Sequence, residues 1–131
     1  MSMFKVNLTA INIKDEERRT PPIEVLVDTG AELSCLPTKL LLEAGIFPRG
    51  KKYFSTATNQ LFERDVGFAL LEAEGFTTID EVIFALDTDE LLLGVRTIEG
   101  FSVMVDNLNH RFVPTPSLAV SMYKLKGDKL T

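Results

Sequence analysis

The sequence is poor in cysteine and in long apolar runs, and both shortages narrow the classes of protein that it can encode. One cysteine among 131 residues excludes a disulfide framework and suits a reducing cytoplasm. No apolar run approaches the ~20 residues that a membrane-spanning helix requires. The first ten residues, MSMFKVNLTA, lack a basic start followed by an apolar core, so we expect no signal peptide and a cytoplasmic location.

Charge and length exclude further classes. The net charge of −5 argues against nucleic acid as a principal partner, and a composition of 45% hydrophobic and 25% charged residues is typical of a compact globular protein. A chain of 131 residues makes one domain and cannot hold two large lobes. We therefore predict a single domain over residues 1–131, with a core over about 4–114 and a C-terminal arm or tail over 115–131.

The most informative segment is IEVLVDTGAELSCLP, from Ile23 to Pro37. The apolar residues before Asp28 favour a buried strand, and Gly30 permits a tight turn directly after it. Asp28 should therefore lie half-buried at the end of a strand. A carboxylate in that position needs to share a proton or accept several hydrogen bonds, which Thr29 and the backbone amides after Gly30 could donate.

The residues DTGA, followed by Ser34, Leu36 and Pro37, resemble the active-site strand and loop of the retropepsin-like aspartic proteases. TKLLLEAGIF is similar to the short helix of the bacterial and archaeal single-domain members, and YFSTATNQLFERDVGFALLE to the flap hairpin. The stretch EVIFALDTDELLLGVRTIEGFSVMVDNLNHRFVP is similar to the closing segment of the family. The resemblance implies an all-β acid protease barrel with one or two short helices, which is half of a pepsin-like architecture.

Only one DTG is present, because Asp87 in ALDTDE is followed by no glycine and reads as an exposed acidic loop. Peptide hydrolysis without a metal or a covalent intermediate needs two carboxyls that share a proton. A twofold homodimer would supply the second from another copy of Asp28. The resemblance thus implies an aspartic endopeptidase that uses an activated water, a peptide or protein substrate and no metal or organic cofactor.

The resemblance also assigns roles to residues. Asp28, Thr29 and Gly30 would form the catalytic turn, with the Thr29 hydroxyls linking the two loops of the dimer. Ala31 would contact substrate, and it lacks the hydroxyl that pepsin-like enzymes carry there, which implies somewhat higher pKa values for the dyad. The substrate would also meet the tip of the flap hairpin, which we assign to Thr58, Asn59 and Gln60.

Patterning predicts the remaining elements. Alternation of apolar and polar residues predicts a strand over 4–10 that forms a hairpin with the strand ending at Asp28. We further expect a short helix from Pro37 or Thr38 to Gly45, a strand from Glu81 to Leu86, and a final hairpin around a turn at Asn107 to Asn109. The resemblance implies that Leu91 to Leu93 lead into Gly94 beneath the catalytic loop.

Several alternatives stay open. Asp28 could cap turn amides in an inert β domain, and the chain could be a noncatalytic dimeric peptide-binding or interaction module, or a monomer. Cys35 with His110 could form a thiol nucleophile, although a lone thiol between Ser34 and Leu36 is more often a small core residue. Ser34, without a recognisable His and Asp in order, favours a buried hydroxyl that braces the loop. Arg96 has no role that the sequence defines.

Overall fold

The computed structural model describes residues 3–116, and within them the chain forms nine strands and two short helices. In chain order these are β1 (Lys5–Ile11), β2 (Ile23–Val27), β3 (Ser34–Pro37), α1 (Thr38–Glu43), β4 (Gly50–Ser55), β5 (Leu61–Ala73), β6 (Phe76–Ala85), β7 (Leu92–Leu93), α2 (Val95–Gly100), β8 (Val103–Asp106) and β9 (Arg111–Pro114). Neither helix is long enough to cross a membrane.

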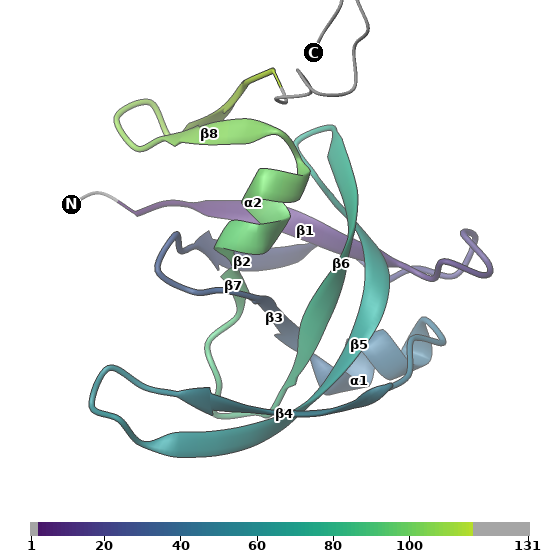
Figure 1. The fold of residues 1–131 in the computed structure, drawn as a ribbon. Helices are drawn as coiled ribbons and strands as arrows, with labels where there is room; N and C mark the ends of the chain where they lie inside the picture. Colours follow the sequence, from purple (N-terminus) through teal and green to yellow (C-terminus); the bar gives the residue numbers. More distant parts are fainter. Residues whose placement is uncertain (1–2, 117–131) are drawn as a thin grey trace, which may run out of the picture.

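Seven strands form one sheet in the order β1-β2-β7-β3-β6-β5-β4, and β1 also pairs with β5. That extra pairing closes six strands into a barrel and leaves β4 on the outside of β5 (Figure 1). The strands β8 and β9 make a separate two-stranded sheet above α2. The predicted all-β barrel with one or two short helices is confirmed.

The core follows the alternation that the sequence shows. In β1 the side chains of Val6, Leu8 and Ala10 are buried while Lys5 and Asn7 are exposed. Burying each large apolar side chain contributes about 1.5–3 kcal/mol, so a register shift by one residue would expose this set. The predicted hairpin of β1 with β2 is present, with antiparallel pairing throughout.

The predicted crossing beneath the loop that carries Asp28 is also present. β7 pairs in parallel with β2, and it pairs antiparallel with β3 through Cys35 and Leu92. Gly94 follows directly, and a Cβ there would lie 2.5 Å from the carbonyl carbon of Leu33. Only glycine therefore allows the two backbone segments to pass this closely.

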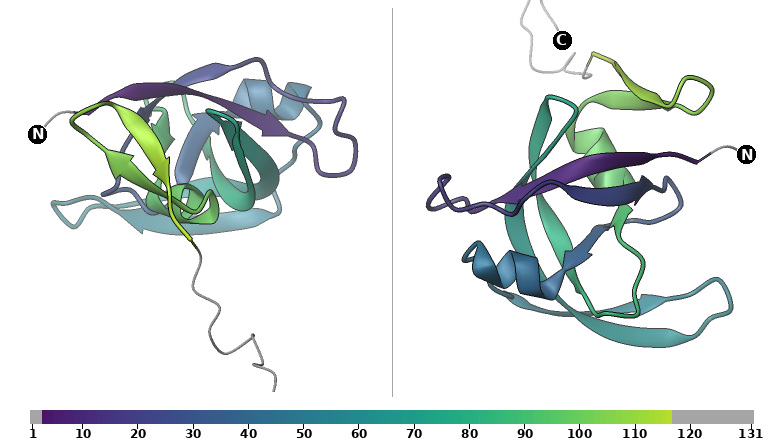
Figure 2. Two further views of the ribbon diagram at one scale, coloured as in Figure 1. Left: turned by 90° about the horizontal axis from the view of Figure 1, so that it is seen from above. Right: turned by 180° about the vertical axis from the view of Figure 1, so that it is seen from behind.

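The hairpin of β4 and β5 forms where the flap was predicted, with its turn over residues 56–60. Thr56 organises the turn, because its hydroxyl accepts hydrogen bonds from the Thr58 and Gln60 amides at 3.3 and 3.1 Å. Asn59 adopts a left-handed conformation with φ of 64°. Two opposite views show this turn on the same side of the molecule as the loop between β2 and β3 (Figures 1 and 2).

The start of one strand differs from the prediction, and one predicted segment lies largely outside the described residues. β6 begins at Phe76 rather than Glu81, because the turn at Glu74 and Gly75 has φ of 52° and 83° and returns the chain directly into pairing with β5. The predicted helix after Pro37 and the final hairpin around residues 107–110 are confirmed. Most of the predicted C-terminal arm, from residue 117 onward, lies outside the described residues.

Candidate active site

Asp28 lies one residue beyond the end of β2 and is half-buried, as predicted. Its backbone amide donates to the carbonyl of Leu93 at 3.0 Å, and its Oδ1 accepts a hydrogen bond from the Gly30 amide at 2.9 Å. The turn continues with the Ala31 amide, which donates to the Asp28 carbonyl at 3.2 Å. The carboxylate is thus oriented by its own turn, whereas Thr29 is exposed and makes no hydrogen bond to it within the described residues.

A buried polar cluster supports this turn from behind. The Ser34 hydroxyl accepts from the Gly94 amide at 2.9 Å and lies 2.7 Å from the Thr97 hydroxyl. Because Thr97 donates its proton to Asp80 Oδ2 at 3.0 Å, Ser34 is the donor to Thr97. The expectation that Ser34 is a buried hydroxyl bracing the loop is therefore confirmed.

Arg96 has a defined role in the structure. Its guanidinium lies 3.3 Å from Asp80 and 3.4 Å from Glu81, two buried carboxylates on β6, and Glu81 also pairs with Lys52 at 2.7 Å. These bonds tie α2 to β6 and to the hairpin. Sequence reasoning missed Asp80 and Glu81, although two adjacent acids in a strand that ends in an apolar run are a signal that buried partners exist.

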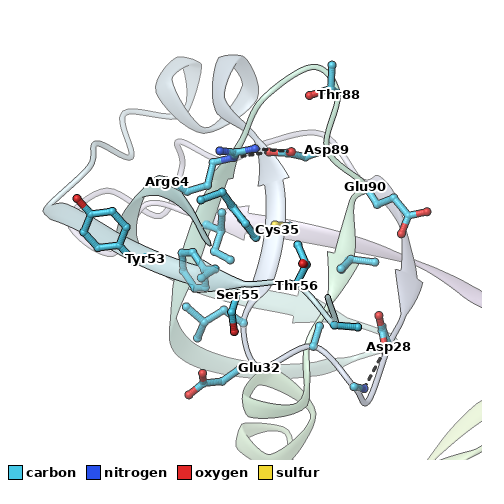
Figure 3. A pocket seen from close by; sticks show the side chains of 18 residues that line it. Asp28, Glu32, Cys35, Tyr53, Ser55, Thr56, Arg64, Thr88, Asp89 and Glu90 are labelled. Carbon is cyan, nitrogen blue, oxygen red and sulfur yellow. Dashed lines mark hydrogen bonds and ion pairs between the residues drawn. The ribbon is translucent and has the colours of Figure 1, made fainter. Parts of the chain in front are cut away.

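A cavity of about 980 Å³ opens beside Asp28, between the loop that follows β2, the β4–β5 hairpin and the loop that follows β6 (Figure 3). Its floor includes the apolar residues Leu33, Ile83 and Leu92. Phe54 and Phe62 from the hairpin line one wall and stack on each other, with ring centroids 5.7 Å apart. The cavity therefore has an apolar floor and wall, and its lining also includes polar and charged side chains, among them the carboxylates of Asp28, Glu32 and Glu90.

Only some of the predicted site residues line this cavity. Asp28, Gly30 and Ala31 line it, and Thr29 does not. The three hairpin residues predicted to bind substrate, Thr58, Asn59 and Gln60, are exposed at the tip and lie outside the lining. The hairpin contributes Ser55, Thr56 and Ala57 instead, together with Tyr53. The substrate roles of the tip residues stay a prediction.

An ion pair that the sequence did not predict lies on the far side of the cavity from Asp28 (Figure 3). Arg64 on β5 donates from Nε and Nη2 to the two carboxylate oxygens of Asp89, both at 2.7 Å. The hydrogen bonds from Arg64 hold the pKa of Asp89 below its usual value, and the same bonds raise the pKa of Arg64. The bidentate geometry makes this the best-formed ion pair around the cavity.

Cys35 is buried beneath the cavity, and burial, with a smaller contribution from the charge of Asp89, raises the pKa of its thiol to about 12. A thiol in that state is a poor nucleophile, which favours the interpretation as a small core residue. His110 lies in the turn between β8 and β9, where its ring stacks on Phe4 with centroids 5.3 Å apart, and it does not line the cavity. Within residues 3–116 no group of three or more His, Cys, Asp or Glu side chains is arranged to hold a metal ion.

No protein-family model matches the chain, and no curated protein matches it. Among solved structures, the chain is similar to the protease of simian foamy virus (mac), at 18% identity and a TM-score of 0.49, over 73% of this chain and 92% of that one. It is also similar to a foamy viral protease-reverse transcriptase in complex with double-stranded DNA, at 22% identity and a TM-score of 0.47, over 71% of this chain. The match covers only 14% of that longer protein.

Proposed function

We propose that the chain is an aspartic-type endopeptidase that acts as a homodimer. The observation that carries the proposal is the position of Asp28, which lies one residue beyond the end of β2 and lines a cavity with an apolar floor. The Gly30 amide orients the carboxylate, and the Leu93 carbonyl fixes the backbone behind it. A carboxylate held in this way, next to space for an extended peptide, is suited to acid–base chemistry on an amide.

The chemistry needs a second carboxyl, and a twofold axis close to Asp28 would supply it from the other subunit. Two carboxyls at that separation share one proton, so they titrate as a pair with two macroscopic pKa values. The ionised member accepts a proton from the attacking water, and the protonated member polarises the scissile carbonyl. Thr29 of each subunit, exposed in a single copy, would cross-link the two turns.

The substrate of the proposed enzyme is a peptide or protein bound in an extended conformation. The outer edge of β4 has no strand partner among the described residues, so it can add a peptide strand. The apolar floor and the phenylalanine wall would then receive apolar side chains from alternate positions of that peptide. The proposed mechanism uses no metal ion and no organic cofactor, and the proposed location is the cytoplasm, which cell fractionation tests.

The experiment is cleavage of a broad peptide library at high protein concentration between about pH 4 and 7, the range in which a carboxyl dyad can hold one proton. New termini are read by mass spectrometry. We expect Asp28→Asn to lower the rate by at least about a hundredfold. The matched control is Asp87→Asn, which alters an exposed carboxylate that does not line the cavity and should retain activity. Equal cleavage by wild type and Asp28→Asn would exclude the mechanism.

Dimerisation is tested separately by analytical ultracentrifugation and by the dependence of activity on concentration. If the active form is the dimer, activity per chain falls on dilution, and the midpoint of that fall matches the dissociation constant from sedimentation. Activity per chain that is constant while the protein dissociates would contradict a shared dyad. Such a result would mean that one subunit is active without a second Asp28.

A second candidate is a noncatalytic dimeric peptide-binding module with the same fold. The position of the hairpin tip favours it, because Thr58, Asn59 and Gln60 do not line the cavity beside Asp28. Such a module would bind library peptides, and both wild type and Asp28→Asn would leave them intact. A statine-containing peptide, which mimics the tetrahedral transition state, would then bind no better than a matched peptide without statine.

A further inference from the structure

The ion pair of Arg64 and Asp89 has more hydrogen bonds and less solvent exposure than a typical surface ion pair. Its two parallel hydrogen bonds are supplemented by one from the Leu86 amide to Asp89 Oδ2 at 2.8 Å and one from Arg64 Nη1 to the Glu63 carbonyl at 2.8 Å. The two side chains are only 16% and 20% exposed. The guanidinium also lies 4.9 Å from the centroid of the Phe62 ring. These contacts fix both charged groups in one geometry.

The pair joins two elements that border the cavity. Arg64 belongs to β5 of the hairpin, and Asp89 belongs to the loop that leads from β6 into β7. Figure 3 shows both side chains together at one end of the cavity, with Asp28 at the other. A substrate side chain that enters over the apolar floor from the direction of Asp28 would therefore reach Arg64 and Asp89 at the far end of the cavity.

We propose that Arg64 and Asp89 determine substrate specificity by forming the closed, charge-balanced end of an apolar side-chain subsite. The inference rests on the proposed function, because it names the side chains that the proposed peptidase accepts. The subsite takes an aromatic or aliphatic side chain, for which Phe54, Phe62 and Ile83 supply contact surface. The end of the subsite offers a charged side chain no unpaired counter-charge, because Arg64 and Asp89 neutralise each other, although Asp28, Glu32 and Glu90 also line the cavity.

This account predicts that removal of either charge inverts the preference of the subsite. Arg64→Met leaves the Asp89 carboxylate without its cation at the end of the cavity, so a lysine or arginine side chain of the substrate becomes its partner. Asp89→Asn leaves the Arg64 guanidinium, so a glutamate becomes favourable. A charge-assisted hydrogen bond in a partly buried site corresponds to about a tenfold change in affinity or more.

Binding provides a readout that does not depend on catalysis. The test uses the full chain with Asp28→Asn, so that peptides are retained, and a positional-scanning peptide library in which each position in turn holds Phe, Lys or Glu. We expect one position to favour Phe in this background, Lys after Arg64→Met and Glu after Asp89→Asn. Arg64→Lys keeps the cation and should keep the exclusion of Lys. Thermal melts identify any variant that does not fold, and Asp89→Asn then carries the test if Arg64→Met fails.

The control is Lys5→Met, which removes the cation of an ion pair between β1 and β2, from Lys5 to Glu24 at 3.7 Å, away from the cavity and the hairpin. It should leave the peptide preference unchanged. Identical profiles for Arg64→Met and Lys5→Met would overturn the inference, even if the chain with Asp28 intact cleaves peptides. If the residue preference inverts as expected but the chain with Asp28 intact cleaves no peptide, the subsite is upheld and the proposed peptidase activity is refuted. Absence of peptide binding in every variant would overturn both.

Discussion

The amide of Asp28 donates to the carbonyl of Leu93, so the backbone that leads into Gly94 holds the turn that carries the candidate catalytic carboxylate. The contact continues on the other side of Gly94, where the Val95 amide donates to the Ala31 carbonyl at 2.8 Å. The turn at Asp28 therefore has its shape only when β7 and the start of α2 are in place. Substitutions at Gly94 and Ser34 test this dependence.

Gly94→Ala should destabilise the protein by about 1–3 kcal/mol, because the new Cβ would meet backbone atoms of Leu33 that cannot move without shifting the loop. Urea denaturation gives the free energy of unfolding. The matched control is Gly50→Ala, where a Cβ would meet nothing within 4 Å, and its free energy of unfolding should stay within about 0.5 kcal/mol of wild type. Similar values for the two variants would contradict the close approach.

Ser34→Ala should cost about 1–3 kcal/mol, because it leaves the buried Gly94 amide without its acceptor and Thr97 without its donor. The same denaturation experiment measures the loss. Ser55→Ala, at an exposed position on β4, serves as the comparison and should change stability little. If both serine variants unfold at the same urea concentration, the Ser34 cluster does not brace the loop.

Cys35 should not react with a thiol reagent such as DTNB at pH 8 in the folded protein, because burial raises its pKa to about 12 and limits access. In denaturant one thiol per chain should react within the mixing time. Ser55→Cys adds an exposed thiol to the hairpin and should give one fast and one slow thiol in the folded state. Fast labelling of the wild type would show that the site is open to solvent.

Asp106 should make stability depend on acid pH. The Asn109 side chain, followed by the Asn109 amide and Arg111, lowers the pKa of its carboxyl from 3.8 to about 2. A group with a lowered pKa stabilises the fold fully above its unfolded value, and this contribution is lost as pH falls from near 3.8 toward 2. Denaturation midpoints between pH 2 and 5 should therefore fall less steeply for Asp106→Asn than for wild type. Asp87→Asn, which makes no side-chain hydrogen bond among the described residues, should follow the wild-type slope.

Much of the fold could be predicted from local pattern. The alternation of residues 4–10 sets which face of β1 is buried, and the apolar run before Asp28 predicts the strand end. The close approach at Gly94 could be expected only from the resemblance to a known closing segment, because its neighbour Leu33 lies far away in the sequence. The two strand features depend on neighbours in the sequence, so the sequence carries them directly.

The polar side of the site could not be predicted, because it depends on which strands lie side by side. Arg64 meets Asp89, and Thr97 meets both Ser34 and Asp80, only after the barrel closes. Nothing near Arg64 in the sequence indicates its partner. How the hairpin lies against the cavity is equally non-local, so the sequence did not show that Ser55 to Ala57 line the cavity in place of the predicted tip residues.

The parallel pairing of β2 with β7, and of β3 with β6, joins segments that are far apart in the chain. Such contacts form slowly, because the chain loses the entropy of a long loop before any strand pairing compensates for it. The hairpins β4–β5 and β5–β6 need only short closures and can form first. We therefore expect the turn at Asp28 to be among the last parts of the chain to fold, so that refolding intermediates would contain a structured hairpin before they contain a competent carboxylate.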